Sequence, residues 1–256
     1  MTSLLHFQQR GYGDNILLIH GLFGRLENLN MVAKMLAAHF CVTSIDVRNH
    51  GNSFHNSVMD YATMAQDVCQ LLDHLSIKST IVLGHSMGGK IAMELALTAP
   101  KYVERLIVAD IAPVKYSPHH TDIIAGLKAV DFSQVKHRRD VKEQLKPYVT
   151  EKAVCEFLLS NLYNENGQFR FRFNVEHIDK NYNNILNCYQ GSQYFKGKVL
   201  FIKGSDSDYI LPEHREDILR LFPKSQAKII QGAGHWLHAE KTIAFNRTVL
   251  QFLNIV

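Results

Sequence analysis

A serine in a glycine-flanked turn is the first residue in the chain that points to chemistry. Ser86 lies in GHSMGG at 84–89, between a short apolar run at 79–84 and a helical pattern at 87–99. In a strand–turn–helix context a G-x-S-x-G pattern is meaningful, because the sharp turn strains the serine backbone and leaves no room for a Cβ two residues away. The free N–H groups at the start of the helix favour developing negative charge. The pattern predicts a nucleophilic serine suited to acyl transfer.

A serine hydroxyl is a weak nucleophile, so a base must lie within hydrogen-bond reach of it. The chain has 14 histidines, and position rather than composition singles out His235. It lies in GAGHW at 232–236, after the last predicted strand and before the last predicted helix. Open α/β sheets place ligands at this edge. We expect His235 to be the general base, and the nearby His238 to be a surface residue or a helix cap.

Acyl transfer also needs preorganised N–H donors for the oxyanion. One donor is expected from Met87, the residue after the serine. The other is expected from HGLFG at 20–24, which follows the first apolar run, with the backbone of Leu22 as first choice and that of Phe23 as second. His20 is expected to shape this loop through hydrogen bonds rather than to act as the base.

The elements that must position these residues alternate between short apolar runs and helical patterns. The runs are too short for helices and are bounded by turn residues, so they predict strands, at 15–20, 40–46, 79–84, 104–110, 198–203 and 226–231. Apolar residues at helical spacing predict helices at 28–39, 61–75, 87–99, 212–221 and 238–253. The alternation predicts an α/β fold with a mostly parallel, twisted sheet and helices on both faces.

One stretch interrupts the alternation. From 113 to 194 the chain is mostly helical in pattern and more polar, and it lies between two predicted strands. We therefore predict a helical lid, inserted after the strand that ends at Asp110. The expected division is a core of residues 1–112 and 195–256 and a cap of residues 113–194.

Composition sets limits on the function. With 256 residues, 46% of them apolar and 20% charged, the chain is long enough for one well-packed domain and is not typical of disorder. A net charge of +4, spread along the chain, gives little support for nucleic-acid binding. The four cysteines show no C-x-x-C spacing, which argues against a zinc site. Acyl transfer by a serine needs no metal or organic cofactor, so none is expected. The polar start and the lack of a long apolar stretch predict a cytoplasmic protein without a membrane span.

Four motifs together resemble a known family. HGLFG at 20–24, DVRNHGNS at 46–53, GHSMGGK at 84–90 and GAGHWLHAEK at 232–241 occur in the order of α/β-hydrolase signatures. The chain is similar to the small cap-bearing bacterial esterases of the YbfF type over almost its whole length, least so in the cap. The resemblance implies the α/β-hydrolase fold and a Ser-His-Asp triad.

The acid of that triad departs from the broad family pattern. Most members carry it as Gly-x-x-Asp after the strand that corresponds to 198–203, but the third residue after Gly204 is Ser207 here. Asp206 and Asp208 flank this serine, and Asp110 ends the preceding strand. The residues alone leave these three aspartates open. Resemblance to the YbfF-type esterases favours Asp110.

Three other segments carry residue types found in active sites. We interpret the loop at 46–51 as structural, with Asp46 and Arg48 pairing to hold its turns. KHRR at 136–139 is expected to be a solvated helix face, with the phosphates of an acyl-CoA as the alternative ligand. FRFRFN at 169–174 places three phenylalanines on one face of an extended stretch, which would anchor the cap or line the pocket.

These residues predict a serine esterase or thioesterase that transfers an acyl group in two steps, with small to medium or CoA-linked acyl groups. Its partner is a small-molecule ester or thioester, and the sequence makes no prediction of oligomeric state. Two other functions are compatible with the same fold, a carbon–carbon bond hydrolase and a small-molecule receptor that retains the triad.

Overall fold

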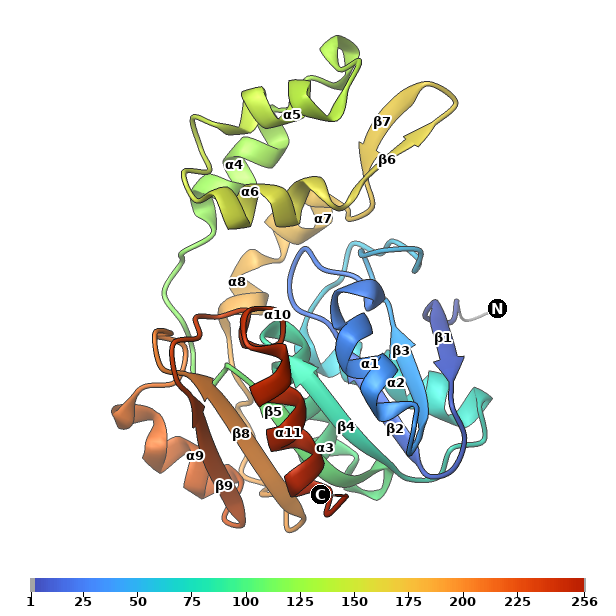
Figure 1. The fold of residues 1–256 in the computed structure, drawn as a ribbon, viewed down its shortest axis with the longest axis vertical. Coiled ribbons are helices and arrows are strands. Elements are labelled where there is room, and N and C mark those ends of the chain that lie inside the picture. Colours follow the sequence, from blue (N-terminus) through green and yellow to red (C-terminus); the bar gives the residue numbers. More distant parts are fainter. Residues whose placement is uncertain (1–2, 256) are drawn as a thin grey trace.

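A seven-stranded sheet forms the centre of the molecule, and the computed structural model describes residues 3–255 of it. The strand order is β1-β3-β2-β4-β5-β8-β9, with every neighbouring pair parallel except the edge pair β1–β3 (Figure 1). The strands are β1 (Phe7–Arg10), β2 (Asn15–Ile19), β3 (Cys41–Ile45), β4 (Thr80–His85), β5 (Val103–Ala109), β8 (Lys198–Gly204) and β9 (Ser225–Ile230). The predicted fold class is confirmed. The six predicted strands are the parallel ones, and β1 is an additional edge strand.

Helices cover both faces of the sheet, which explains why the central strands are almost continuously apolar. Ile16 and Leu18 of β2 belong to one hydrophobic cluster, while Leu17 and Ile19 belong to the other. The first cluster contains residues of α1 (Asn30–Leu36) and α11 (Thr242–Phe252). The second contains residues of α2 (Tyr61–His74), α3 (Met87–Thr98) and the end of α9 (Arg215–Leu221).

Several predicted helices are divided where the backbone leaves helical geometry. The helix predicted at 28–39 begins with a 3₁₀ turn, Leu26–Leu29, before α1. The one predicted at 212–221 is a 3₁₀ turn, Pro212–His214, followed by α9. The last is α10 (Leu237–Glu240) and α11, separated by Lys241 with φ −131° and ψ 51°. Two further 3₁₀ turns are Pro100–Tyr102 and Phe132–Gln134.

The stretch from 113 to 194, which we call the cap segment, lies over the carboxyl ends of the parallel strands, at the top of Figure 1. Its elements are α4 (Thr121–Ala129), α5 (Arg138–Leu145), α6 (Lys152–Leu159), β6 (Leu162–Glu165), β7 (Gln168–Phe171), α7 (Val175–Lys180) and α8 (Tyr182–Leu186). The division into core and cap at residues 112 and 195 stays a prediction, and this layout supports it.

The cap segment is not purely helical, because β6 and β7 form an antiparallel hairpin. Asn166 and Gly167 connect the two strands with φ values of 51° and 87°. Asn-Gly is a strong signal for a two-residue hairpin turn, so the sequence contained the information that the helical prediction overlooked. The rings of Phe171 and Phe173 stack 4.9 Å apart. Phe173 also lies 5.2 Å from the ring of Phe23, which anchors the cap segment on the core.

No helix within residues 3–255 is both long enough and apolar enough to cross a lipid bilayer.

Candidate active site

Ser86 occupies a strained turn between β4 and α3. Its φ is 53° and its ψ is −122°, a conformation that costs free energy for a residue with a side chain. A Cβ on Gly84 would lie 2.1 Å from the carbonyl oxygen of Gly88, and one on Gly88 would lie 2.3 Å from that of Ile19. Both glycines are therefore required by close backbone approach. The turn leaves the Ser86 side chain at the amino-terminal end of α3.

His235 lies in the loop between β9 and α10, and its ring connects two of the predicted site residues. Its Nε2 atom is 2.9 Å from Ser86 Oγ, and its Nδ1 atom is 2.8 Å from Asp110 Oδ2. An ionised carboxylate only accepts hydrogen bonds, so Nδ1 carries the proton and Nε2 is free to accept one from the serine hydroxyl. The ring of Tyr209 stacks on the imidazole with centroids 3.9 Å apart, which restricts its rotation.

Two side chains that the sequence analysis did not identify hold the His235 loop. The carboxylate of Glu240 accepts the N–H groups of Gly234 at 2.7 Å and Trp236 at 3.2 Å, one on each side of the histidine. His85 contacts the carbonyl oxygen of His235 through Nε2 at 2.9 Å. A carbonyl only accepts, so His85 donates this bond. His85 lies in the motif at 84–90 and Glu240 in the motif at 232–241. Their positions in these motifs could have identified them as site residues.

Asp110 is the aspartate that the structure brings to His235. Its side chain is fully buried and accepts the backbone N–H of Gly204 at 3.0 Å. The hydroxyl of Ser207, at the position where most of the family carries its acid, donates to Asp110 Oδ2. Asp206 is exposed and accepts a hydrogen bond from Ser205 at 2.7 Å. Asp208 is also exposed. Asp110 follows β5, which ends at Ala109 rather than at Asp110 itself.

The loop at 20–24 approaches Ser86 from the end of β2. His20 is buried, with Nδ1 2.8 Å from the carbonyl oxygen of Gly21, and its Nε2 accepts the N–H of Val47 at 3.1 Å. These hydrogen bonds agree with the expectation that His20 holds the shape of the loop. The N–H of Phe23 is donated to His50 Nε2 at 3.1 Å, so it is already engaged. Leu22 lies beside Ser86 on the wall of the adjoining cavity.

A cavity of about 640 Å³ opens between the cap segment and the core, with Ser86 and His235 on its wall. Much of its lining is apolar, from Leu22, Phe23, Ile123, Val154, Phe157 and Trp236. The rings of Phe157 from α6 and Trp236 from the His235 loop lie 5.7 Å apart, so the two parts of the chain meet at this cavity. Its size is that of a site for a small organic molecule.

Comparison with known proteins agrees with this geometry. A family model described as the alpha/beta hydrolase fold matches residues 14–242. The chain belongs to the α/β-hydrolase fold family.

Several of the similar proteins are named as esterases or lipases. The chain is 40% identical to the sn-1-specific diacylglycerol lipase ABHD11 of Xenopus laevis, over 94% of this chain and 80% of that protein. It is 37% identical to esterase YbfF of Escherichia coli, over 96% of each chain. The solved structure of a marine microorganism esterase superposes with a TM-score of 0.95 at 37% identity, covering 98% of this chain and all of that one. By class the chain is a carboxylic ester hydrolase of this superfamily.

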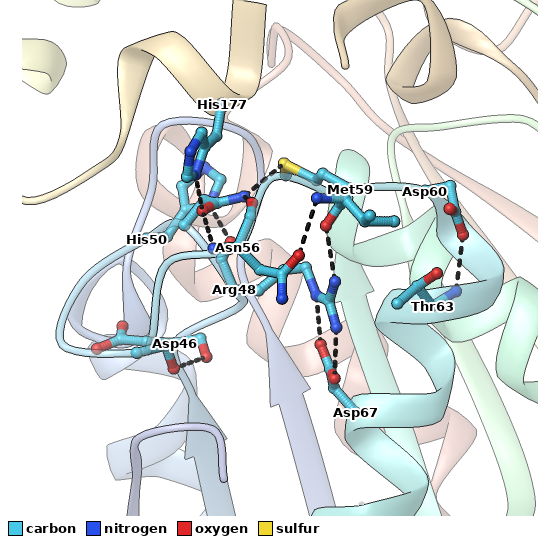
Figure 2. Close-up of polar contacts among 12 residues, drawn as sticks. Asp46, Arg48, His50, Asn56, Met59, Asp60, Thr63, Asp67 and His177 are labelled. Carbon is cyan, nitrogen blue, oxygen red and sulfur yellow. Dashed lines mark hydrogen bonds and ion pairs between the residues drawn. The ribbon is translucent and has the colours of Figure 1, made fainter. Parts of the chain in front are cut away.

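The loop at 46–51 of this α/β hydrolase is held differently from the prediction. Asp46 and Arg48 do not pair with each other. Arg48 forms a two-pronged ion pair with Asp67 of α2, at 2.6 and 2.7 Å (Figure 2). Asp46 instead accepts the N–H groups of Leu26 and Asn52, both at 2.8 Å. The expectation failed because the sequence does not show that α2 passes beneath this loop.

The cationic run at 136–139 is only partly a solvated face. Arg138, the first residue of α5, donates through Nη1 to the carbonyl oxygen of Leu159 and through Nη2 to that of Leu162, both at 2.8 Å. Arg138 thus ties α5 to the end of α6, which is a structural position. Arg139 has a side chain that is 79% exposed.

His238 is neither on the surface nor at a helix cap, which corrects the prediction. It lies inside α10 with a buried ring, 4.5 Å from the ring of His85. Burial, with a smaller contribution from His235, lowers the pKa of His238 to about 4. The protein therefore holds a neutral imidazole beneath the His235 loop.

The low pKa of His238 predicts acid sensitivity. In the unfolded chain a histidine binds its proton near pH 6.5, whereas in the folded chain it does so near pH 4. The unfolded state therefore binds more protons in this window, and the free energy of unfolding falls as pH falls through it. As the pH falls from 6.5 to 4.5, the free energy of unfolding should fall less steeply in the variant His238→Leu than in the unmodified protein. The difference between the two slopes should be up to about 1.4 kcal/mol per pH unit. Urea unfolding at several pH values measures this, and equal slopes for both proteins would contradict it.

Proposed function

We propose that this protein is a serine esterase or thioesterase with Ser86 as nucleophile, His235 as general base and Asp110 as the acid that orients the base. The single observation that carries the proposal is the position of the His235 ring, 2.9 Å from Ser86 Oγ on one side and 2.8 Å from Asp110 on the other. A nucleophile, a base and a group that orients the base, in hydrogen-bond contact, are the parts that covalent acyl transfer needs.

The reaction would proceed in two steps, the formation of an acyl-enzyme and its hydrolysis. His235 Nε2 takes the hydroxyl proton as Ser86 Oγ bonds to the substrate carbonyl carbon. The bond to the alcohol or thiol then breaks, and His235 returns the proton to that leaving group. In the second step His235 takes a proton from water as the water oxygen attacks the acyl-enzyme, and Ser86 leaves with the proton while the carboxylic acid is released.

The oxyanion of each tetrahedral intermediate would be held by the backbone N–H groups of Met87 and Leu22. Met87 is the first residue of α3, where N–H groups have no intrahelical acceptor. Since the N–H of Phe23 is donated to His50, Leu22 is the better second donor. Asn161 of the cap segment supports the same loop by donating to the carbonyl oxygen of Phe23 at 2.9 Å. No metal or organic cofactor enters these steps.

The substrate would be a carboxylic ester or thioester that fits the apolar cavity, with a small to medium or CoA-linked acyl group. The cavity volume of about 640 Å³ suits a molecule of that size. One similar protein is named a diacylglycerol lipase, so glycerol esters belong beside p-nitrophenyl and CoA esters in a substrate screen.

Covalent labelling tests the proposal directly. A fluorophosphonate probe should attach to Ser86, as located by mass spectrometry of the digested protein, and should block hydrolysis of p-nitrophenyl butanoate at one equivalent. Ser86→Ala should take up no probe. Ser205→Ala, which removes a hydroxyl that bonds Asp206 rather than the base, is the matched control and should still be labelled. Full hydrolytic activity in protein whose Ser86 is not labelled would refute the assignment.

A further inference from the structure

A second, much smaller cavity adjoins Ser86. It has a volume of about 30 Å³, and its lining includes Ser86, Leu22 and Met87. The lining also includes Tyr61, Lys90, Ile111, Tyr116, Ile185 and Leu186. Ser86 and Leu22 line both cavities, whereas His235 lines only the large one. The nucleophile therefore stands between two spaces of very different size.

The chemistry assigns one half of the substrate to each space. The leaving oxygen or sulfur must receive a proton from His235 Nε2, so the leaving group has to lie on the side of Ser86 that His235 lines. The carbonyl oxygen faces the N–H groups of Leu22 and Met87. The remaining substituent of the carbonyl carbon is the acyl chain, which then points toward the small cavity that those two residues also line.

Resting on the proposed function, we propose that the acyl chain occupies the small cavity and the alcohol or thiol occupies the large one. A water-sized group needs about 10–15 Å³ of such space, so about 30 Å³ admits two or three carbon atoms beyond the carbonyl. The preferred substrates are thus short-chain esters or thioesters, acetyl to butanoyl, of bulky alcohols or thiols.

The wall of the small cavity is held in place by its own hydrogen bonds. Tyr61 donates its hydroxyl to the carbonyl oxygen of Ile185 at 2.6 Å. Lys90 is buried and donates to the carbonyl oxygens of Val114 at 2.7 Å, near the start of the cap segment, and of Asn187 at 2.6 Å, directly after α8. A longer acyl chain would have to break these buried polar contacts to enter, and each break is costly. A sharp limit on chain length follows.

Hydrolysis of p-nitrophenyl esters of increasing acyl length tests the assignment on the unmodified protein. The value of kcat/KM should be highest between acetate and butanoate and should fall at least about tenfold from butanoate to hexanoate. Hexanoate has two more methylenes than butanoate, and even one surplus methylene in an apolar pocket has an effect of about this size. In a second series with a constant acetyl group, 1-naphthyl acetate should be hydrolysed at least as well as phenyl acetate. A preference for octanoate or longer esters would overturn the assignment.

Two isoleucines provide a matched pair of variants. Ile185 lines only the small cavity and Ile123 only the large one. Ile185→Ala should move the preferred acyl length up by one to three carbons, whereas Ile123→Ala should leave it unchanged. Ile111→Ala enlarges the same small cavity from the core side and replaces Ile185→Ala if that variant does not fold. A shift of acyl length caused by Ile123→Ala alone would overturn the assignment.

Failure of the inference differs from failure of the proposed function. If Ser86 is labelled and esters are hydrolysed with a long-chain preference, only the placement of the acyl chain is wrong. If no ester is hydrolysed and Ser86 is not labelled, the serine mechanism itself is wrong, and the acyl assignment falls with it.

Discussion

Replacing Asp110 with Asn should lower kcat for p-nitrophenyl butanoate about 10⁴-fold while the protein stays folded. The carboxylate accepts a hydrogen bond from the Nδ1–H group of His235 at 2.8 Å, which keeps Nε2 unprotonated on the side that faces Ser86. An amide at position 110 can donate to Nδ1 instead, which favours the tautomer that cannot take the serine proton. The lost stabilisation of the imidazolium adds to this, and removal of the acid in comparable triads has an effect of about 10⁴.

Asp206→Asn is the matched control for this experiment. The exposed Asp206 side chain bonds Ser205, not His235, so the same chemical change there should alter kcat less than about threefold. Circular dichroism and thermal unfolding of both variants verify that the fold is retained. A large loss in Asp206→Asn together with a small loss in Asp110→Asn would reverse the choice of acid.

Asp67→Asn breaks the ion pair between Arg48 and Asp67, and we expect it to lower the free energy of unfolding more than any other substitution proposed for this protein. Both side chains are buried, and two hydrogen bonds of 2.6 and 2.7 Å join them (Figure 2). Arg48 also donates to the carbonyl oxygen of Val58. Asp67→Asn leaves the guanidinium without its counter-charge in a site that is largely buried. Removing one partner of a buried pair costs about 3–5 kcal/mol, which urea unfolding at pH 7.5 can measure.

An exposed pair provides the comparison. Asp217 and Arg220 lie one turn apart on α9 with side chains that are 45% and 54% exposed. Asp217→Asn should therefore cost no more than about 1 kcal/mol. Equal losses in the two variants would show that burial is not what makes the Arg48–Asp67 pair important.

The Arg48–Asp67 pair is also connected to the candidate active site through a chain of hydrogen bonds. The carbonyl oxygen of Arg48 contacts His50 Nδ1 at 3.0 Å, and His50 Nε2 accepts the N–H of Phe23 at 3.1 Å. Phe23 is the neighbour of Leu22, so a line of bonded groups runs from α2 to the loop beside Ser86. The motif at 46–53 is thus a support for that loop, and it takes no direct part in the proposed chemistry.

The parallel arrangement of the strands brings the residues of the candidate site together. Ser86, Asp110 and His235 directly follow or closely follow β4, β5 and β9, and the loop at 20–24 follows β2. The carboxyl ends of parallel strands lie at one sheet edge, so residues as far apart in the chain as Ser86 and His235 meet there. The sequence analysis could select Ser86 and His235 as candidates because each lies in a distinctive turn at such an end.

The residues alone do not decide which aspartate contacts His235. Asp110 and Asp206 both follow strands that end at this same edge, so their positions along the chain do not separate them. The direction of each side chain does. Asp110 has a φ of 53°, is buried against Gly204 and Ser207, and faces His235, whereas Asp206 faces solvent.

By itself, the sequence determined the parallel sheet, the strained serine turn and the late histidine, because apolar runs and obligatory glycines are local properties that can be recognised without coordinates. Only the tertiary structure decided which aspartate faces His235, which residue pairs with Arg48, that His238 is buried and that two cavities of unequal size meet at Ser86. Each of these depends on side chains from distant segments packing together, and such packing follows from the arrangement of the whole chain rather than from any local pattern.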